Sequence, residues 1–402
     1  MKETEIGEIP EDWKLDYLEN ITKQISDIDH FMPPSVRVGI PYLMTSDLQP
    51  KISQVNFDEC KQVDGIFYDR FARKIKAELD DIVFARYATI GTVSYVDINK
   101  KFLVSYSCVV IKPHLAKVYG KYLYHYFKSD VFFKSVELLL NSNIQSNIGI
   151  DGLNRTKILL PSKQEQEQII EVLSDTDNLI QATEQLINKK QLIKTATMQN
   201  LLTGKIRLAE FDTKQTKLSE LGEIPSDWDV VNLGNYVEIR KGETITLANI
   251  KYGDIPVIAG GKKPAYFHNQ ANRFGKTITI SASGASAGFV SFHENNIFAS
   301  DCSTISESKK YSIEYLFYNL LLRQSDIYKM QAGGAQPHVQ PKDLKPMLLV
   351  LSNNYEEQNM IAQIFLDMDK ELTALNERLT KLNDIKQGLM QDLLTGKIRL
   401  TE

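Results

Sequence analysis

The chain has 402 residues, the length of two to three ordinary domains. Hydrophobic residues make up 43% and charged residues 24%, which excludes collagen-like, disordered and disulfide-scaffold classes. The acidic N-terminal segment has no apolar stretch, and no run of about 18 apolar residues occurs, so we expect neither a signal peptide nor a membrane span. Three cysteines in so long a chain indicate a reducing compartment, and we expect a cytoplasmic protein.

The net charge of −4 is unevenly distributed along the chain. Residues 19–160 carry 18 Lys and Arg against 15 Asp and Glu, residues 235–350 carry 13 against 9, and the remainder carries 16 against 27. Two mildly basic regions, of +3 and +4, therefore lie within a frame of −11. Charges this small permit contact with nucleic acid in both regions without requiring it.

Two blocks of sequence occur twice. Residues 7–13, GEIPEDW, recur as GEIPSDW at 222–228, an offset of 215. Residues 198–208, MQNLLTGKIRL, recur at 390–400 with one change, an offset of 192. Each half of the chain therefore consists of a Trp motif, a variable region and a closing Leu-Leu-Thr-Gly block, and the variable region is 23 residues shorter in the second half. This internal repeat decides the predicted architecture.

The segment before each Leu-Leu-Thr-Gly block has the apolar period of a long helix, about 60 Å over residues 164–203. Ser162 with Glu165, and Asn354 with Glu357, predict a capping box at each start, and Gly204 and Gly396 suit the C-terminal ends. The second copy has an unbroken heptad seam of Ile361, Phe365, Met368, Leu372, Leu375, Leu379 and Leu382. The first copy has Val172, Leu179, Leu186 and Ile193 at steps of seven, with Leu173, Ile180 and Ile187 beside them.

A single helix of this length with an apolar stripe needs a partner. Pairing of the two copies within one chain is favoured over a coiled coil between chains, because globular regions lie between the copies. We expect an antiparallel pair, related by a pseudo-twofold axis, with Leu173, Ile180, Ile187, Phe365, Leu372 and Leu379 packing between the helices. Joining Glu402 to Met1 would recreate the central linker, so the two ends of the chain should lie close together.

The two variable regions share an order of features but little sequence. Each has a β-rich stretch with a Gly-containing turn (81–93 and 277–290), a strand bearing a cysteine (Cys108 and Cys302) and an aromatic helical patch (119–133 and 311–328). Each ends in a polar loop, at 141–147 and 333–338. This mixture predicts two small α+β domains. The aromatic patches and the cysteines are interpreted as core residues.

The polar loops hold residue types that read base edges, since Asn and Gln bond adenine, Arg bonds guanine and Ser bonds either. Plain surface connections have the same composition, but the recurrence of these loops in both halves favours base contact. Nearby Lys and Arg would hold phosphates. The candidate DNA-binding residues are Arg70, Arg73, Lys74, Lys76, Arg86, Tyr87, Thr89, Asn141, Ser142, Asn143, Gln145, Ser146 and Asn147 in the first half, and Lys241, Lys262, Lys263, Ser281, Ser283, Ser286, Gly333, Gly334, Gln336 and His338 in the second.

No catalytic motif is present in the sequence. Gly275-Lys276-Thr277 lacks the upstream glycine of a phosphate-binding loop, because position 270 is Gln. Residues 31–35, FMPPS, lack the flanking residues with which an amino-methyltransferase frames paired prolines. The six histidines are scattered, and none lies at metal-ligand spacing from a cysteine or second histidine. We predict no catalytic residue, no metal and no cofactor in this chain.

The two Gly-Glu-Ile-Pro-x-Asp-Trp motifs, the two Glu-Gln-led helices ending in Leu-Leu-Thr-Gly-Lys-Ile-Arg-Leu, and the divergent regions between them resemble a type I restriction–modification specificity (S) subunit. The resemblance covers the whole chain. It implies target recognition domains at 19–160 and 235–350, conserved helical regions at 161–208 and 351–402, a linker at 209–234, and an N-terminal segment, 1–18, that completes the cyclic repeat.

The resemblance also implies a function without catalysis in this chain. The family binds one bipartite sequence of double-stranded DNA, one half-site per domain, and unlike domains imply an asymmetric target. Two modification (M) subunits would bind S-adenosylmethionine and methylate adenine N6, and two restriction (R) subunits would use ATP and Mg²⁺. Two alternatives stay open: a partner in which nuclease and methyltransferase are fused, and a non-catalytic scaffold whose two domains bind proteins.

Overall fold

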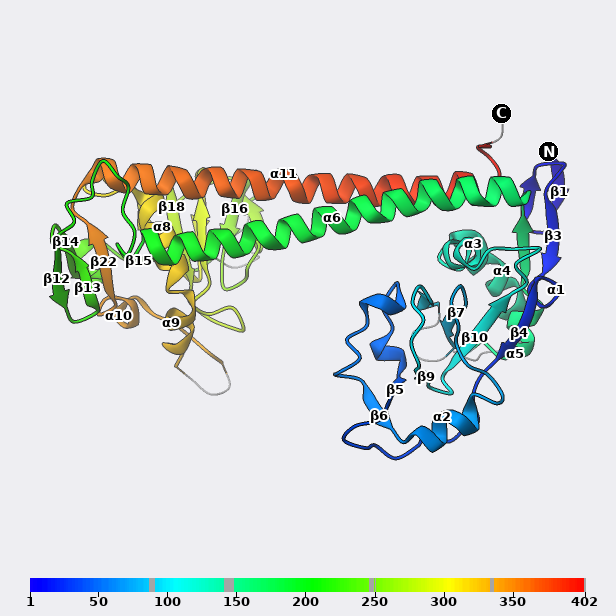
Figure 1. Ribbon diagram of the computed structural model, residues 1–402. Coiled ribbons are helices and arrows are strands. Elements are labelled where there is room, and N and C mark those ends of the chain that lie inside the picture. The colour runs from blue at the N-terminus through cyan, green and yellow to red at the C-terminus, as the bar shows by residue number, and fades with distance from the viewer. Residues whose placement is uncertain (87–90, 141–147, 246–248, 250, 333–335, 401–402) are drawn as a thin grey trace. The chain divides into compact units, whose positions relative to one another are not determined.

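The computed structural model describes residues 1–86, 91–140, 148–245, 249, 251–332 and 336–400. The chain forms two compact units (Figure 1). Unit 1 contains residues 1–184 and 378–402, and unit 2 contains residues 185–377. Two long helices, α6 (Lys163–Leu201) and α11 (Tyr355–Leu394), each continue from one unit into the other. Over the described residues, no helix is long and apolar enough to cross a membrane.

Unit 1 is an α+β unit. Its strands are β1 (Lys2–Thr4), β2 (Gly7–Ile9), β3 (Lys14–Tyr17), β4 (Thr22–Ser26), β5 (Ile40–Leu43), β6 (Lys61–Val63), β7 (Ile82–Ala85), β8 (Val93–Tyr95), β9 (Leu103–Val104), β10 (Cys108–Pro113) and β11 (Lys157–Leu160). Its shorter helices are α1 (Leu18–Ile21), α2 (Gly65–Phe71), α3 (Gly120–Tyr126), α4 (Asp130–Leu140) and α5 (Ile150–Asn154), with 3₁₀ turns at Thr45–Asp47 and Ile52–Gln54.

Unit 2 has the same mixed content. Its strands are β12 (Thr216–Ser219), β13 (Gly222–Pro225), β14 (Trp228–Asn232), β15 (Arg240–Lys241), β16 (Ile255–Ile258), β17 (Tyr266–His268), β18 (Thr277–Ser281), β19 (Val290–His293), β20 (Phe298–Ala299), β21 (Cys302–Ser306) and β22 (Leu348–Ser352). Its shorter helices are α7 (Leu233–Tyr236), α8 (Ile313–Leu322), α9 (Gln324–Lys329) and α10 (Pro341–Leu344).

The two units share one sheet topology. The four-stranded sheet has the order β4-β10-β7-β8 in unit 1 and β15-β21-β18-β19 in unit 2. The three-stranded sheet has the order β6-β5-β9 in one and β17-β16-β20 in the other, with one antiparallel and one parallel pairing in each. Each framing pair, β3 with β11 and β14 with β22, is antiparallel. The predicted internal repeat of two α+β domains is therefore confirmed.

Buried apolar strands carry each core. Cys108 begins β10 opposite Ala85, and Cys302 begins β21 opposite Ser281, so the two cysteines occupy equivalent positions. All three cysteines are buried and free, and burial was expected for Cys108 and Cys302. Burial raises the pKa of both Cys108 and Cys302 to about 12. The aromatic patches are also core, since Tyr122 and Tyr315 are fully buried. They occupy equivalent places on α3 and α8, the helices that cover the sheets.

The long helices pair antiparallel in each unit taken by itself. In unit 2, Lys190 contacts Glu371 at 2.7 Å, and one turn further along α6 Lys194 pairs with Asp369, nearer the start of α11. In unit 1, Lys386 of α11 contacts Asp177 of α6 at 2.5 Å. The offset of 192 relates Asp177 to Asp369 and Lys194 to Lys386, so one ion pair occurs twice. The predicted antiparallel pairing is confirmed.

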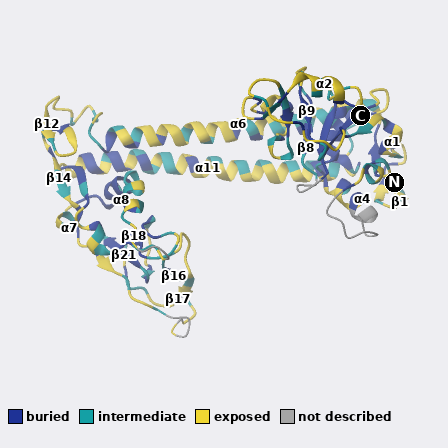
Figure 2. Ribbon diagram, turned by 90° about the horizontal axis from the view of Figure 1, so that it is seen from below, coloured by how far each residue is buried: buried dark blue, intermediate teal, exposed yellow. Residues whose placement is uncertain are grey.

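Only one of the two predicted sets of apolar residues on α6 forms the buried seam. Leu173 and Ile180 are buried, and Ile187 is half-buried. By contrast, Leu179, Leu186 and Ile193 are 41%, 40% and 43% exposed. A helix presents only one face to a single partner, so the neighbouring set at steps of seven remains on the outer side. Figure 2 shows exposed residues along both long helices. On α11, Phe365 and Leu372 are buried and Leu379 is half-buried.

The predicted capping boxes are only half formed. The N–H of Glu165 donates to the Ser162 hydroxyl at 3.2 Å, and the N–H of Glu357 donates to Asn354 Oδ1 at 3.2 Å. The two Glu carboxylates do not return to the cap backbone. They bond the repeated Trp instead, with Trp13 Nε1 donating to Glu165 at 2.9 Å and Trp228 Nε1 donating to Glu357 at 3.0 Å. A buried carboxylate gains more from indole and guanidinium donors than from a surface cap.

An arginine of the repeated closing block completes each of these sites. Arg399 donates to Glu165 at 2.6 and 2.9 Å and to Asp12 at 2.9 and 2.7 Å. Arg207 donates to Glu357 at 2.9 and 2.8 Å and to Asp227 at 2.8 and 3.1 Å. We call these two clusters, Asp12-Trp13-Glu165-Arg399 and Asp227-Trp228-Glu357-Arg207, the Trp–Glu–Arg nodes. The nodes explain why both blocks recur. Each node takes its Asp and Trp from the Gly-Glu-Ile-Pro-x-Asp-Trp block and its Arg from the Leu-Leu-Thr-Gly block.

Candidate nucleic-acid interface

The residue that follows each polar loop bonds the equivalent position in both units. In unit 1 the N–H of Ile148, the first described residue after the 141–147 loop, donates to the Arg86 carbonyl at 3.4 Å. In unit 2 the N–H of Val339 donates to the Ala282 carbonyl at 2.9 Å. Arg86 follows β7 and Ala282 follows β18, which are equivalent strands. The residue that follows the polar loop is therefore held just beyond the end of an inner strand of the four-stranded sheet in each domain.

In unit 2 three loops come together there. The N–H of Gly284 donates to the Pro337 carbonyl at 3.0 Å, and Ser283 forms an isolated antiparallel bridge with His338. The Ser281 hydroxyl donates to the Gly260 carbonyl at 2.8 Å, which adds the loop that carries Lys262 and Lys263. Residues predicted separately from three stretches of sequence are thus neighbours. We call the meeting of residues 260–263, 281–288 and 336–338 the unit 2 loop junction.

The side chains at this junction differ in exposure. Ser281 is buried, Ser283, Ser286 and His338 are half-buried, and Gln336 is exposed. Lys241, Lys262 and Lys263 are exposed, with Lys262 Nζ 5.4 Å from the centre of the Phe289 ring. Hydroxyls, an imidazole and amines around glycine turns are suitable groups for base edges and phosphates.

In unit 1 the predicted Arg86 is buried. Its Nη2 donates to Asp27 at 2.5 Å and to the Tyr106 carbonyl at 3.1 Å, and its side chain is 6% exposed. Asp27 also contacts Lys74 at 3.2 Å and His30 at 3.3 Å. Since a buried guanidinium is held by its carboxylate partner, the Arg86 side chain lies inside the domain, away from solvent.

The other predicted basic residues of unit 1 are exposed along α2 and the segment that follows it. Arg70 lies 3.5 Å from Asp29, and Lys76 lies 2.8 Å from Glu78. Arg73 is exposed. Surface pairs of this kind are weak and exchange readily for phosphate. The remaining candidates, Tyr87, Thr89, Asn141, Ser142, Asn143, Gln145, Ser146, Asn147, Gly333 and Gly334, lie outside the described residues.

Sequence reasoning missed Asp301 and Gly260. Asp301 directly precedes β21, and its carboxylate accepts a hydrogen bond from the Ser283 hydroxyl. A side chain at position 260 would place its Cβ 2.7 Å from the Ser283 carbonyl oxygen, so Gly260 allows the close approach of two loops. One signal was available, because each central strand of the three-stranded sheets begins with Ile-Pro, at Ile40 and Ile255, which aligns the domains.

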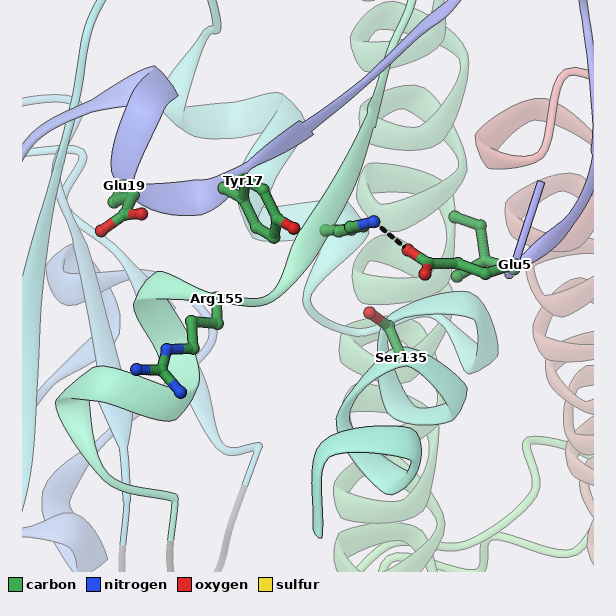
Figure 3. A pocket seen from close by; sticks show the side chains of 7 residues that line it. Glu5, Tyr17, Glu19, Ser135 and Arg155 are labelled. Atoms are coloured by element: carbon green, nitrogen blue, oxygen red, sulfur yellow. Dashed lines mark ion pairs between the residues drawn. The ribbon is translucent and has the colours of Figure 1, made fainter. Parts of the chain in front are cut away.

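A hollow of unit 1 lies elsewhere. It has a volume of about 500 Å³ and is crossed by an ion pair between Glu5 and Lys157, with Tyr17, Ser135 and Arg155 around it (Figure 3). Across the described residues, no three His, Cys, Asp or Glu side chains are grouped to hold a metal ion. The residues named around this hollow do not place a nucleophile beside a general base.

Two domains of one fold, each framed by the same repeated blocks, define a protein built from two related modules. Comparison with known proteins gives the family. The model of the type I restriction modification DNA specificity domain matches residues 39–190 and 225–387. The chain belongs to this family and is a type I restriction–modification specificity subunit.

Relatives and solved structures agree with this assignment. The chain is 28% identical to a Methanocaldococcus jannaschii protein named for the MjaX type I restriction enzyme specificity subunit, over 99% of this chain and 96% of that one. It is 26% identical to the MjaVIII specificity subunit of that organism, over 61% of this chain and 62% of the relative.

Two solved structures share the fold. The crystal structure of an S subunit from M. genitalium gives a TM-score of 0.63 at 17% identity and covers 98% of both chains. A chain from a study of complex assembly in a type I R-M system gives 0.56 at 16% identity, covering 97% of this chain and 100% of that one.

Proposed function

We propose that this specificity subunit reads double-stranded DNA with both units, each recognising one half-site of a bipartite target, and that it carries no catalytic residue. The observation that supports this most is an equivalent hydrogen bond in the two domains. The residue that follows the polar loop donates to the residue just after an inner strand, from Ile148 to Arg86 in unit 1 and from Val339 to Ala282 in unit 2. Two modules of one fold can then dock on DNA in the same way.

The side chains near these equivalent hydrogen bonds support an asymmetric target. In unit 1 Arg86 forms a buried pair with Asp27, whereas in unit 2 the corresponding strand end carries Ser283, which donates to Asp301. Sequence is read by side chains at base edges, while phosphate contacts only position the protein. Two domains that dock alike but present different side chains select different base pairs, so the two half-sites differ.

The partners follow from the type I system. A subunit that reads DNA needs another chain for chemistry, and adenine must leave the stack before its N6 can be methylated. We infer two M subunits that bind S-adenosylmethionine and two R subunits that use ATP and Mg²⁺. Support comes from a neighbour in fold, whose structure concerns assembly of a type I R-M complex. Over the described residues, the Trp–Glu–Arg nodes and the paired helices are the repeated features available to such partners.

The test is DNA binding by the chain copurified with its methyltransferase. Titration with duplex DNA at 50 to 200 mM salt should give a log–log slope of about −0.9 per phosphate bound. A duplex carrying the target should bind more tightly than one with either half-site scrambled. Binding that ignores both salt and sequence would contradict the proposal and favour a protein-binding scaffold. Copurification with one chain holding both nuclease and methyltransferase would identify the fused alternative.

A further inference from the structure

Asp301 lies beside the unit 2 loop junction. Its carbonyl oxygen accepts the N–H of Ala282 at 3.0 Å, and its carboxylate accepts the Ser283 hydroxyl. A Cβ at Gly260 would lie 3.2 Å from Asp301 Oδ2, so this oxygen faces the 260–263 loop. The side chain is half-buried.

Several buried carboxylates of this protein are paired with cations. Asp27 has Arg86 and Lys74, and Asp81 has Lys112 at 2.6 Å. The two node carboxylates have Arg399 and Arg207. These pairings follow from the cost of removing a charge from water without a partner. Asp301 has a hydroxyl donor and no ion pair over the described part of the chain. The half-buried Asp80 and Asp97 share this pattern. Asp301 differs from them because it lies beside the unit 2 loop junction.

The surroundings of Asp301 indicate which chemical group would donate a hydrogen bond to its carboxylate. Lys262 and Lys263 on the adjoining loop are exposed and suited to phosphates, which an ionised carboxylate repels. An ionised carboxylate only accepts hydrogen bonds. Among base edges in the major groove, the amino groups of cytosine N4 and adenine N6 donate, whereas guanine O6 and N7 and thymine O4 accept.

We propose that Asp301 is a specificity-determining residue, whose carboxylate accepts a hydrogen bond from the amino group of a cytosine or adenine in the half-site read by unit 2. This rests on the proposed DNA-reading function. The Ser283 hydroxyl holds one oxygen in place and leaves the other for the base. The equivalent position in unit 1 is Ser107, whose carbonyl accepts the N–H of Arg86 at 3.0 Å, so the requirement belongs to one half-site alone.

The amide variant Asp301→Asn separates the charge from the shape. Asparagine both donates and accepts, so it tolerates guanine or thymine where the carboxylate rejects them. The intact complex, with its methyltransferase, is expressed in a host without other adenine methylation, and methylated sites are read by modification-sensitive sequencing. We expect discrimination against guanine and thymine to fall about fivefold or more at one position of one half-site. The other half-site should keep its sequence.

Two further variants make the test specific. Asp229→Asn makes the same chemical change on β14 of unit 2, where the carboxylate is exposed and pairs with Lys217, and should leave the motif unchanged. If Asp229→Asn relaxes the motif to the same degree, the effect does not belong to the Asp301 carboxylate and the proposal is overturned. Asp301→Ser, which copies the side chain of Ser107, replaces the amide variant if the latter yields no complex.

The outcomes also separate this inference from the function beneath it. A wild-type motif that is unchanged in Asp301→Asn overturns the assignment of Asp301 and leaves DNA reading intact. A wild-type complex that methylates no defined motif overturns both.

Discussion

Arg399 and Asp12, 387 residues apart in the chain, form a bidentate ion pair with distances of 2.9 and 2.7 Å. In unit 2 the same pair is made by Arg207 and Asp227, only 20 residues apart. The long-range contact of one unit is thus the local contact of the other. The ends of the described chain lie close together, as the repeats predict, and the arginine lowers the pKa of the Asp12 carboxyl. In unit 1 the two segments that carry this pair come from opposite ends of the chain, whereas in unit 2 the central linker joins them directly.

Removal of the node arginine should destabilise unit 1. Arg399→Ala leaves the buried Glu165 carboxylate with only the Trp13 indole, and an unpaired buried charge costs about 3–5 kcal/mol. Urea unfolding of the purified chain measures this loss. Lys397→Ala, whose side chain is 72% exposed, is the matched control and should change the free energy of unfolding by less than about 0.5 kcal/mol. Equal effects of the two variants would contradict a structural role for the node.

The node of unit 2 should behave alike. Arg207→Ala strips the same donors from Glu357, so its effect should match that of Arg399→Ala within about 1 kcal/mol. Because the two nodes share no residue and lie in separate units, thermal unfolding of the double variant should show both losses. A double variant no less stable than either single variant would show that the sites are not independent.

The stability of unit 1 should fall on acidification because of His125. Burial lowers the pKa of this imidazole from its usual 6.5 to about 3, although Asp177 lies 4.0 Å away. Near pH 7 the ring is neutral in both states. As the pH falls through 6.5 the unfolded chain binds a proton that the folded chain refuses, so folding loses up to about 1.4 kcal/mol per pH unit until the pH approaches 3.

This dependence is measured by urea unfolding at pH 7, 6 and 5. His125→Phe should flatten the decline relative to the wild-type chain, whereas His114→Gln, which removes an exposed histidine of the same unit, should leave it as it is. If His125→Phe and the wild type lose stability in parallel, the buried ring is not the group responsible. Unit 2 has Tyr318 in the matching place, with its hydroxyl donating to Asp369 at 2.7 Å, and lacks this titration.

Lys262 and Lys263 should contribute affinity without sequence preference. Replacing both with Gln removes two cations from the unit 2 loop junction, which should lower the magnitude of the salt slope by about 0.9 for each phosphate that is no longer bound. The preferred target should stay the same, because phosphate contacts carry no sequence information. Titrations of target and scrambled duplexes by fluorescence anisotropy give both quantities. A changed preference for bases would place these lysines at base edges instead.

Helix length should set the spacing of the two half-sites. Both α6 and α11 run from one unit into the other, so seven residues added to each keep the apolar seam in phase and lengthen the pair by about 10 Å. Sequencing of methylated sites should then show a spacer longer by about three base pairs, at roughly 3.4 Å each, between unchanged half-sites. An unaltered spacer would exclude the helices as the ruler.

Much of the frame could be predicted because it is repeated and periodic. The 164–203 helix is observed as 163–201, and Gly204 and Gly396 follow the long helices with φ of +71° and +70°. Side-chain partners were harder to predict. Glu165 and Glu357 satisfy a capping pattern in sequence, yet a buried Trp and Arg from distant segments attract their carboxylates. Only tertiary packing supplies those donors.

The residues of the unit 2 loop junction, together with Arg86, show a second limit of prediction from sequence. Composition identified Ser283, Lys262 and His338 separately, but their convergence depends on sheet order. Arg86 has the right chemistry for guanine, and only the structure reveals that Asp27 holds it inside the domain. The domain limits at 19–160 and 235–350 stay predictions. The boundary between the two compact units falls near the middle of each long helix, so each helix belongs partly to unit 1 and partly to unit 2.

The most direct measurement of the central claim is modification-sensitive long-read sequencing of host DNA, with and without this gene, in cells that produce the methyltransferase partner. We predict that deletion abolishes N6-methyladenine at one asymmetric bipartite motif and that the restored gene returns it. An unchanged methylation pattern in cells that make active methyltransferase would contradict the claim that this chain selects the DNA target.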